Sequence, residues 1–240
     1  PADFAGSDLS FASSAVCRTA CLNIEGASPT KDYSSVDGII GVYCLRWRVT
    51  YAFLTEVPLR KGTESALNKG LAPHGYTCKC PPHQRGGLGA ALVYPAHTDI
   101  TDFRSHAHGR VVAAEGTLPR GDNHVCFNLA AAYCPQGGTN PIHARSTHFR
   151  TTESEVTEAV LSILDDSRSA GRSLLLGTDA NAIASMLDTW STSAVPRTDA
   201  SISRWIQAGL CDTFRVLHPN VHVATHYSTH GAGASRLDYI

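Results

Sequence analysis

The sequence lacks three features that would place the protein in a specialised class. It has no run of about 18 apolar residues and no signal-peptide pattern, so neither a membrane span nor secretion is predicted. Charge of one sign is not in excess, because 20 Lys and Arg residues balance 21 Asp and Glu residues to a net charge of −1. This balance argues against a strongly basic, sequence-indifferent nucleic-acid coat but leaves room for a local positive groove.

Zinc-knuckle spacing is also missing, although the chain has eight cysteines. The nearest approach to Cys-x-x-Cys is Cys78-Lys79-Cys80, and a single intervening residue does not form the turn that chelates zinc. Several other cysteines lie in apolar, strand-like runs, where a free thiol acts as a small hydrophobic group. The pattern therefore predicts free thiols in a reducing, intracellular compartment.

The 240 residues present, of which 42% are hydrophobic, suffice for one compact domain with a sizeable core. We expect a loose, Ala/Ser-rich leader over residues 1–15 and a single domain over residues 16–240. Apolar spacing predicts helices over 33–46, 151–168 and 200–208, a loop over 60–75, and strands over 76–80, 88–94, 110–118 and 124–133. Consecutive strands joined by short turns favour antiparallel pairing.

The most informative segment is residues 174–181, an apolar strand that reaches Gly177 and then presents Asp179 and Asn181. Side chains two residues apart on an extended chain point to the same side, so both can reach one reacting group. The carboxylate can bind or deprotonate a water, and the amide can donate to charge developing on a phosphate oxygen. The alternative is a plain turn, in which Asp and Asn bond their own backbone.

Four further segments have the same form, a short apolar strand that ends in or carries a polar side chain. They comprise residues 16–26 with Asn23 and Glu25, residues 51–56 with Glu56, residues 125–135 with Tyr133, and residues 233–240 with Asp238. We expect the polar groups of all five segments to converge on one rim of a pair of stacked sheets.

In order, spacing and flanking sequence, these segments resemble the endonuclease/exonuclease/phosphatase superfamily of DNase-I-like nucleases and apurinic endonucleases. The resemblance spans about residues 16–240. The segments 210–215 and 235–240, together with Thr225, are most similar to the endonuclease domains of non-LTR retrotransposons. The resemblance implies a four-layer α/β sandwich of two mixed, mainly antiparallel sheets flanked by helices.

The resemblance also implies a metal site. Glu56 matches the carboxylate that holds Mg²⁺, with Mn²⁺ as an alternative, and a hard cation of this kind takes oxygen ligands. Asn23 matches the asparagine that supports this ligand, and Glu25 lies where an acidic residue assists through water. Thr55 stands where the family usually has Gln, and its shorter side chain weakens the expected support of Glu56.

The remaining matches concern the chemical step. Tyr133 corresponds to a tyrosine that contacts the scissile phosphate, although a tyrosine also suits an amphipathic rim position. Asp179 and Asn181 take the water and transition-state roles described above. Asp238 matches a carboxylate that orients a catalytic histidine. The family has that histidine in a further Ser-Asp-His strand, so we expect the domain to be truncated before its last strand.

The resulting hypothesis is a Mg²⁺-dependent endonuclease that nicks double-stranded DNA and leaves a 3′-hydroxyl for a reverse-transcriptase region of the same polypeptide, in the nucleus. Thr225, Ser235 and Arg236 are the predicted DNA contacts, because a protruding hairpin can enter a groove. Two alternatives remain open at this point. One is a phosphoesterase acting on a small molecule or lipid, and the other is a catalytically dead nucleic-acid-binding module.

Overall fold

The computed structural model describes most of the chain. The described residues are 17–24, 33–82, 87–120, 123–134, 147–189, 200–227 and 234–240. The predicted leader over residues 1–15 therefore lies outside them.

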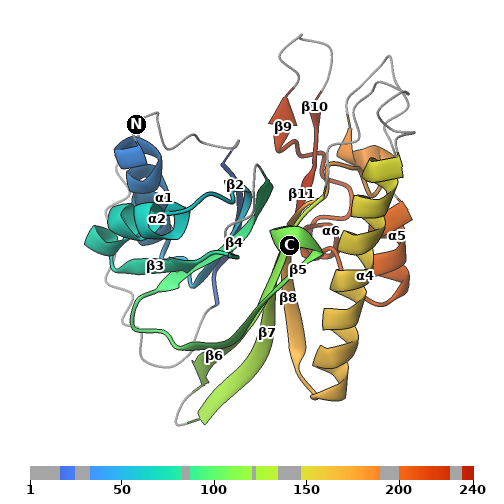
Figure 1. Cartoon of the computed structure of the whole chain (residues 1–240). Coiled ribbons are helices and arrows are strands. Elements are labelled where there is room, and N and C mark those ends of the chain that lie inside the picture. Colours follow the sequence, from blue (N-terminus) through green and yellow to red (C-terminus); the bar gives the residue numbers. More distant parts are fainter. Residues whose placement is uncertain are drawn as a thin grey trace.

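Helices and strands alternate along the chain (Figure 1). The helices are α1 (Tyr33–Trp47), α2 (Thr63–Leu71), α4 (Thr147–Ser169), α5 (Ala200–Gln207) and α6 (Thr213–Leu217), with short 3₁₀ turns η1 (Ala72–His74), η2 (Ala107–Gly109) and η3 (Met186–Asp188). The strands are β1 (Thr19–Asn23), β2 (Tyr51–Pro58), β3 (Tyr76–Lys79), β4 (Leu88–Pro95), β5 (Ile100–His106), β6 (Val111–Arg120), β7 (Asn123–Tyr133), β8 (Ser173–Asp179), β9 (His226–Tyr227), β10 (Ala234–Ser235) and β11 (Asp238–Tyr239).

Two mixed sheets dominate the described part of the chain. One has the order β1-β2-β4-β3 and the other has the order β11-β8-β7-β6-β5, with β9 and β10 forming a separate two-stranded ribbon. β1 runs parallel to β2 and β7 runs parallel to β8, whereas the other paired strands are antiparallel. The expected pair of mixed, mainly antiparallel sheets is confirmed.

The elements stack in four layers, with α1 and α2 on one flank, α4 and α5 on the other, and the sheets between them (Figure 1). Between the two sheets lies a core that includes Phe53 and Leu92 from one sheet and Val112 and Leu129 from the other. All four side chains are fully buried. Burying a large aliphatic or aromatic side chain contributes about 1.5–3 kcal/mol, so this interface holds the two sheets in a fixed relation.

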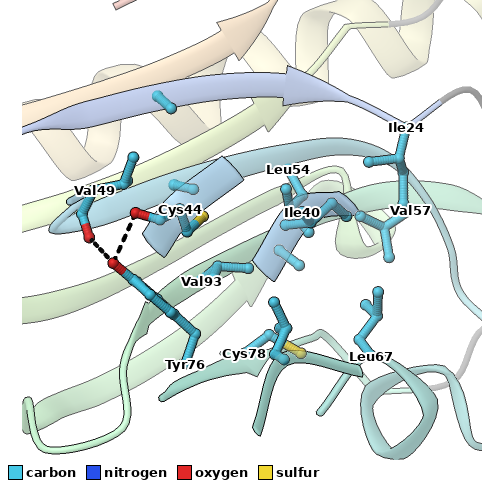
Figure 2. Close-up of a cluster of buried hydrophobic side chains, with 14 of the residues drawn as sticks. Ile24, Ile40, Cys44, Val49, Leu54, Val57, Leu67, Tyr76, Cys78 and Val93 are labelled. Atoms are coloured by element: carbon cyan, nitrogen blue, oxygen red, sulfur yellow. Dashed lines mark hydrogen bonds between the residues drawn. The ribbon is translucent and has the colours of Figure 1, made fainter. Parts of the chain in front are cut away.

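A second core packs the first sheet against α1 and α2, and Figure 2 shows its side chains. Ile40 and Cys44 from α1 and Leu67 from α2 meet Leu54 on β2. The Tyr76 hydroxyl group lies 3.0 Å from the carbonyl oxygen of Cys44 and 2.8 Å from that of Val49. The hydroxyl thus lies beside one carbonyl in the last turn of α1 and one just beyond its end, where the Cys44 carbonyl also accepts from the Val49 N–H at 2.9 Å.

Close sheet contact requires a glycine at position 177. A Cβ atom there would lie 2.3 Å from Cγ and Cδ2 of Phe53, and real Cβ atoms do not approach other atoms so closely. Phe53 is fully buried and cannot swing away.

We therefore expect Gly177→Ala to lower the free energy of unfolding by about 1–3 kcal/mol or more, because overpacking forces the sheets apart. Urea denaturation measures this loss. The matched control is Gly87→Ala, whose Cβ would meet only Leu59 at an ordinary 3.6 Å. Equal stability of Gly177→Ala and the wild type would contradict the described sheet spacing.

Most predicted elements are present within a few residues, including α1, α4, α5 and the strands β3, β4, β6 and β7. The predicted loop over 60–75 is wrong, because α2 and η1 occupy most of it. Thr63, Leu67 and Leu71 are buried on one face of α2, and this four-residue spacing was obscured by the surrounding Gly, Pro and Lys residues. β5 and α6 were also missed.

All eight cysteines are free thiols, as the spacing predicted. Among the described helices, none is both long enough and apolar enough to cross a membrane.

Candidate active site

Glu56 is positioned by an irregularity in β2. The register between β2 and β4 shifts between Leu54 and Val57, and Glu56 has a left-handed φ of 55°. This conformation is costly for a residue with a Cβ, and such strain often marks a functional position. The bulge leaves the carboxylate buried at the end of an otherwise regular strand, with 8% of the residue exposed.

Asn23 lies beside Glu56 because β1 is parallel to β2, with Asn23 opposite Thr55 in the register. Its Nδ2 donates to Oε1 of Glu56 at 3.1 Å and to Oδ2 of Asp179 at 2.8 Å. Glu56 belongs to one sheet and Asp179 to the other. One amide group therefore joins two carboxylates across the junction of the sheets.

Asp179 is the last residue of β8 and only 2% exposed. The pKa of its carboxyl is raised to about 7, chiefly by burial and then by the negative charges of Asp238 and Glu56. Hydrogen bonds from the Asn181 backbone and the Asn23 side chain act in the opposite direction. A carboxyl with a pKa near neutrality is suited to exchange a proton with water.

Asn181 lies beside Asp179 as predicted, but the backbone conformation that places it there differs from the prediction. Its φ of 49° is left-handed, so the chain is not extended from Asp179 to Asn181. Instead the Asn181 backbone N–H donates to Oδ1 of Asp179 at 3.1 Å, and its Nδ2 donates to the Cys134 carbonyl at 2.9 Å. The first is the turn bond of the alternative interpretation, and the second is a long-range bond that holds the amide beside the carboxylate.

Tyr133 ends β7 directly opposite Asp179 in the parallel pair β7–β8. Burial raises the pKa of its hydroxyl to about 12, with a further contribution from the charge of Glu56, so the phenol stays protonated near neutral pH. The guanidinium carbon of Arg110 lies 4.9 Å from the ring centroid of Tyr133, which is a cation–π contact. The sequence analysis missed Arg110, because no motif surrounds it.

Asp238 faces Asp179 across the antiparallel pair β8–β11. The backbone N–H groups of Leu237 and Asp238 donate to Oγ1 of Thr225, at 3.0 and 3.2 Å. Thr225 thus anchors the chain just before Asp238. Thr225 was predicted to contact DNA, and this stays a prediction. In the structure its hydroxyl oxygen accepts the two backbone hydrogen bonds just described.

Arg236 does not take the position expected of a DNA contact. The residue is 2% exposed, and its guanidinium binds Asp188 and Asp212. A guanidinium held by two carboxylates is not presented to a phosphate, so we correct this prediction. Ser235 pairs with His226 in the β9–β10 ribbon, and Glu25 lies outside the described residues.

The structure therefore brings together all six predicted catalytic residues, with five of them linked to Asp179 by hydrogen bonds, by strand register or, for Glu56, through Asn23: Asn23, Glu56, Tyr133, Asn181 and Asp238. Within the described ranges no group of three or more His, Cys, Asp or Glu side chains is close enough to enclose a metal by itself. The donor set is instead two carboxylates joined by an amide. Such a set suits a hard cation that keeps several of its waters.

Comparison with known proteins bears on the fold that carries this site. No family model and no curated protein matches the sequence. Solved structures do match. A 3′ phosphatase from Neisseria, bound to a product DNA hairpin, has a TM-score of 0.67 and 18% identity over 85% of this chain and 80% of its own. An AP endonuclease from Leishmania major has a TM-score of 0.66 and 16% identity over 92% and 76%.

The endonuclease domain of TRAS1, a telomere-specific non-LTR retrotransposon, matches with a TM-score of 0.51 and 14% identity over 93% of this chain and 84% of its own. At these identities the likeness concerns the fold. The protein has the fold of the endonuclease/exonuclease/phosphatase superfamily, the family that its sequence motifs resemble.

Proposed function

We propose that the protein is a Mg²⁺-dependent phosphodiesterase that nicks double-stranded DNA. The observation that carries this proposal is the bridge from the Asn23 amide to the carboxylates of Glu56 and Asp179, at 3.1 and 2.8 Å. Two carboxylates at the junction of two sheets are an unfavourable arrangement, because like charges in a buried place repel each other. A bound cation would offset that cost.

The chemistry of the donor set fits Mg²⁺, with Mn²⁺ as a substitute. Glu56 would hold the ion, and Asn23 would support it by fixing the Glu56 carboxylate. When bound, the ion supplies positive charge that neutralises phosphate and makes its phosphorus easier to attack. The bulge at Glu56 supports this role, since a left-handed glutamate is otherwise unfavourable.

The side chains of the chain itself perform the proton and charge steps. Asp179 accepts a proton from the attacking water, for which a pKa of about 7 is well matched. Tyr133 remains a protonated donor and offers its hydroxyl hydrogen to a non-bridging phosphate oxygen. Asn181 uses one amide hydrogen on the Cys134 carbonyl, and its second hydrogen serves the developing oxyanion.

DNA is the proposed substrate because the Neisseria neighbour holds a DNA product and the TRAS1 neighbour is an endonuclease domain. Following the sequence motifs, we further propose that the nick primes a reverse-transcriptase region of the same polypeptide, in the nucleus. A small-molecule phosphoesterase is the second candidate, since a mannosyl-6-phosphatase is among the solved structures that match. The convergence of all six predicted catalytic side chains favours an enzyme over a dead binding module.

The proposal predicts that purified protein converts supercoiled plasmid into the nicked circle in the presence of Mg²⁺. Glu56→Gln keeps the size of the side chain but removes its charge, so we expect nicking to fall by on the order of a hundredfold. The matched control is Glu158→Gln, an exposed glutamate whose partner Arg204 is also exposed, and it should nick at the wild-type rate.

Gel electrophoresis of the plasmid forms measures these rates. A parallel assay of inositol phosphates and sphingomyelin separates the two substrate classes. Hydrolysis of these compounds together with intact plasmid would overturn the proposal for DNA and support the small-molecule alternative.

A further inference from the structure

A buried charge network lies behind the site, centred on Arg236. Its Nε donates to Oδ1 of Asp188 at 2.9 Å, and its Nη1 donates to Oδ1 of Asp212 at 3.1 Å, while Nη2 binds the other Asp212 oxygen. Asp188 is fully buried and also binds Arg215. The planar fork of one arginine therefore joins two segments that are distant in sequence.

The bonds to Arg outweigh the burial of Asp188. Burial alone would raise the pKa of this carboxyl, but the hydrogen bonds and charges of Arg236 and Arg215 hold it below its usual value. The carboxylate is thus kept ionised, and the ion pair persists across the neutral range. The arrangement is preorganised before any ligand arrives.

The network is connected to the catalytic residues by short stretches of backbone. Arg236 precedes Asp238 by two residues, and the Arg236 backbone N–H donates to the Asp188 carbonyl at 2.8 Å. Between them, the Leu237 carbonyl accepts from the Ala180 N–H at 2.8 Å, immediately after Asp179. Arg236 lies between β10 and β11, so any shift of its backbone also moves Asp238 relative to Asp179.

The segment 181–188 connects the catalytic Asn181 to Asp188, which binds the Arg236 guanidinium. It begins with the left-handed Asn181 and ends with Asp188 on the guanidinium. In its middle, the Ala184 N–H donates to the Tyr239 hydroxyl at 2.9 Å, and that hydroxyl lies 3.1 Å from the Ala182 carbonyl.

Tyr239 in turn packs against Arg236, whose guanidinium carbon lies 4.3 Å from the Tyr239 ring centroid. Arg236 therefore contacts, directly or through Tyr239, both the middle and the end of segment 181–188.

We propose that Arg236 is a positioning residue, whose clamp on Asp188 and Asp212 holds Asn181 and Asp238 beside Asp179 in the geometry that hydrolysis requires. The inference rests on the proposed function for its kinetic consequence. It assigns no contact with substrate to Arg236. Small displacements of catalytic groups have large effects on rate, because the reacting geometry tolerates little error.

Arg236→Lys tests this directly, since it keeps the positive charge but loses the fork that binds two carboxylates. We expect kcat for plasmid nicking to fall about tenfold or more, while KM stays within about threefold, for enzyme corrected to its folded fraction. The matched control is Arg204→Lys, which makes the same change in the exposed Arg204–Glu158 pair and should leave both constants unchanged. An unchanged kcat in Arg236→Lys would overturn the proposal.

If Arg236→Lys does not fold, the triple variant Arg236→Met, Asp188→Asn and Asp212→Asn carries the test. It removes the charge of Arg236 together with those of its two carboxylate partners, and neutral replacements of this kind are often tolerated. The charge of Arg215 remains, but its side chain is 19% exposed and retains access to water. The proposal expects it to fold with a similarly reduced kcat. A folded triple variant with wild-type kcat would contradict it.

Amide hydrogen exchange separates this proposal from the proposed function. In Arg236→Lys we expect faster exchange over 181–189 and 236–239 with unchanged exchange in β2 and β4, whether or not the wild type hydrolyses a phosphoester. Absence of activity in the wild type would overturn the proposed function alone. Unchanged exchange over 181–189 would overturn the clamp.

Discussion

Asp179→Asn is expected to reduce the rate of DNA nicking by on the order of a hundredfold or more, because it removes the group that accepts the proton of the attacking water. Asn23 Nδ2 binds Oδ2 of Asp179 at 2.8 Å and the Asn181 N–H binds Oδ1 at 3.1 Å, so the single oxygen of an asparagine can keep only one of these two hydrogen bonds. The substitution therefore removes the base together with one hydrogen bond, while the size of the side chain is retained. Initial rates of plasmid nicking measure the change.

Binding should change much less than turnover in this variant. We expect its affinity for DNA to stay within a few-fold, since Asp179 contributes chemistry rather than phosphate contacts. Asp165→Asn is the matched control, because Asp165 is an exposed aspartate on α4 whose side chain is 77% exposed. Wild-type turnover in Asp179→Asn would refute the assignment of this carboxylate.

The same substitution should stabilise the metal-free protein at neutral and alkaline pH. In the folded state the pKa of Asp179 is about 7, compared with 3.8 for an unperturbed carboxyl, chiefly because of burial and the charge of Asp238. Folding therefore favours the protonated form. Its stabilising contribution is fully present below about pH 4 and is lost as the pH rises to 7, with no further change above that.

Each unit of pKa shift corresponds to about 1.4 kcal/mol, which sets a ceiling of about 4 kcal/mol on the effect. Urea denaturation at pH 5 and pH 8, with a chelator present, measures it. We expect Asp179→Asn to exceed the wild type in free energy of unfolding by more at pH 8 than at pH 5. An equal difference at the two pH values would show that Asp179 titrates normally.

The surroundings that suit Asp179 to catalysis therefore also lower the stability of the folded protein. Asp179 lies between Asp238 and Glu56, whose charges both raise its pKa, and only the bonds from Asn23 and Asn181 act against them. Glu56 adds a left-handed backbone at the bulge in β2. Active sites commonly carry such local costs, which the rest of the fold offsets.

The site was largely predictable because its residues sit at the ends of apolar strands. Alternation and a terminal carboxylate identify Glu56 and Asp179 from local sequence, and the parallel pairing of β7 with β8 then aligns Tyr133 opposite Asp179. What local sequence does not contain is the backbone conformation. The left-handed Asn181 replaces the extended chain that its spacing suggested.

Long-range contacts account for the other differences. Arg236 is followed closely by Asp238 and was interpreted as a DNA contact, yet its partner Asp188 is 48 residues away. Arg110 reaches the site only because η2 and the start of β6 bring it over the Tyr133 ring. α2 was missed because its apolar spacing is short and is interrupted by glycine and lysine.

The most direct test of the account is a titration of nicking rate against Mg²⁺ concentration for the wild type and for Glu56→Gln, with EDTA as the reference state. If Glu56 holds the ion, the wild type will be inactive in EDTA and will saturate with Mg²⁺. Glu56→Gln will need far more Mg²⁺ or will stay inactive throughout. Nicking by the wild type in EDTA, or identical Mg²⁺ curves for the two proteins, would contradict a metal-dependent site at Glu56.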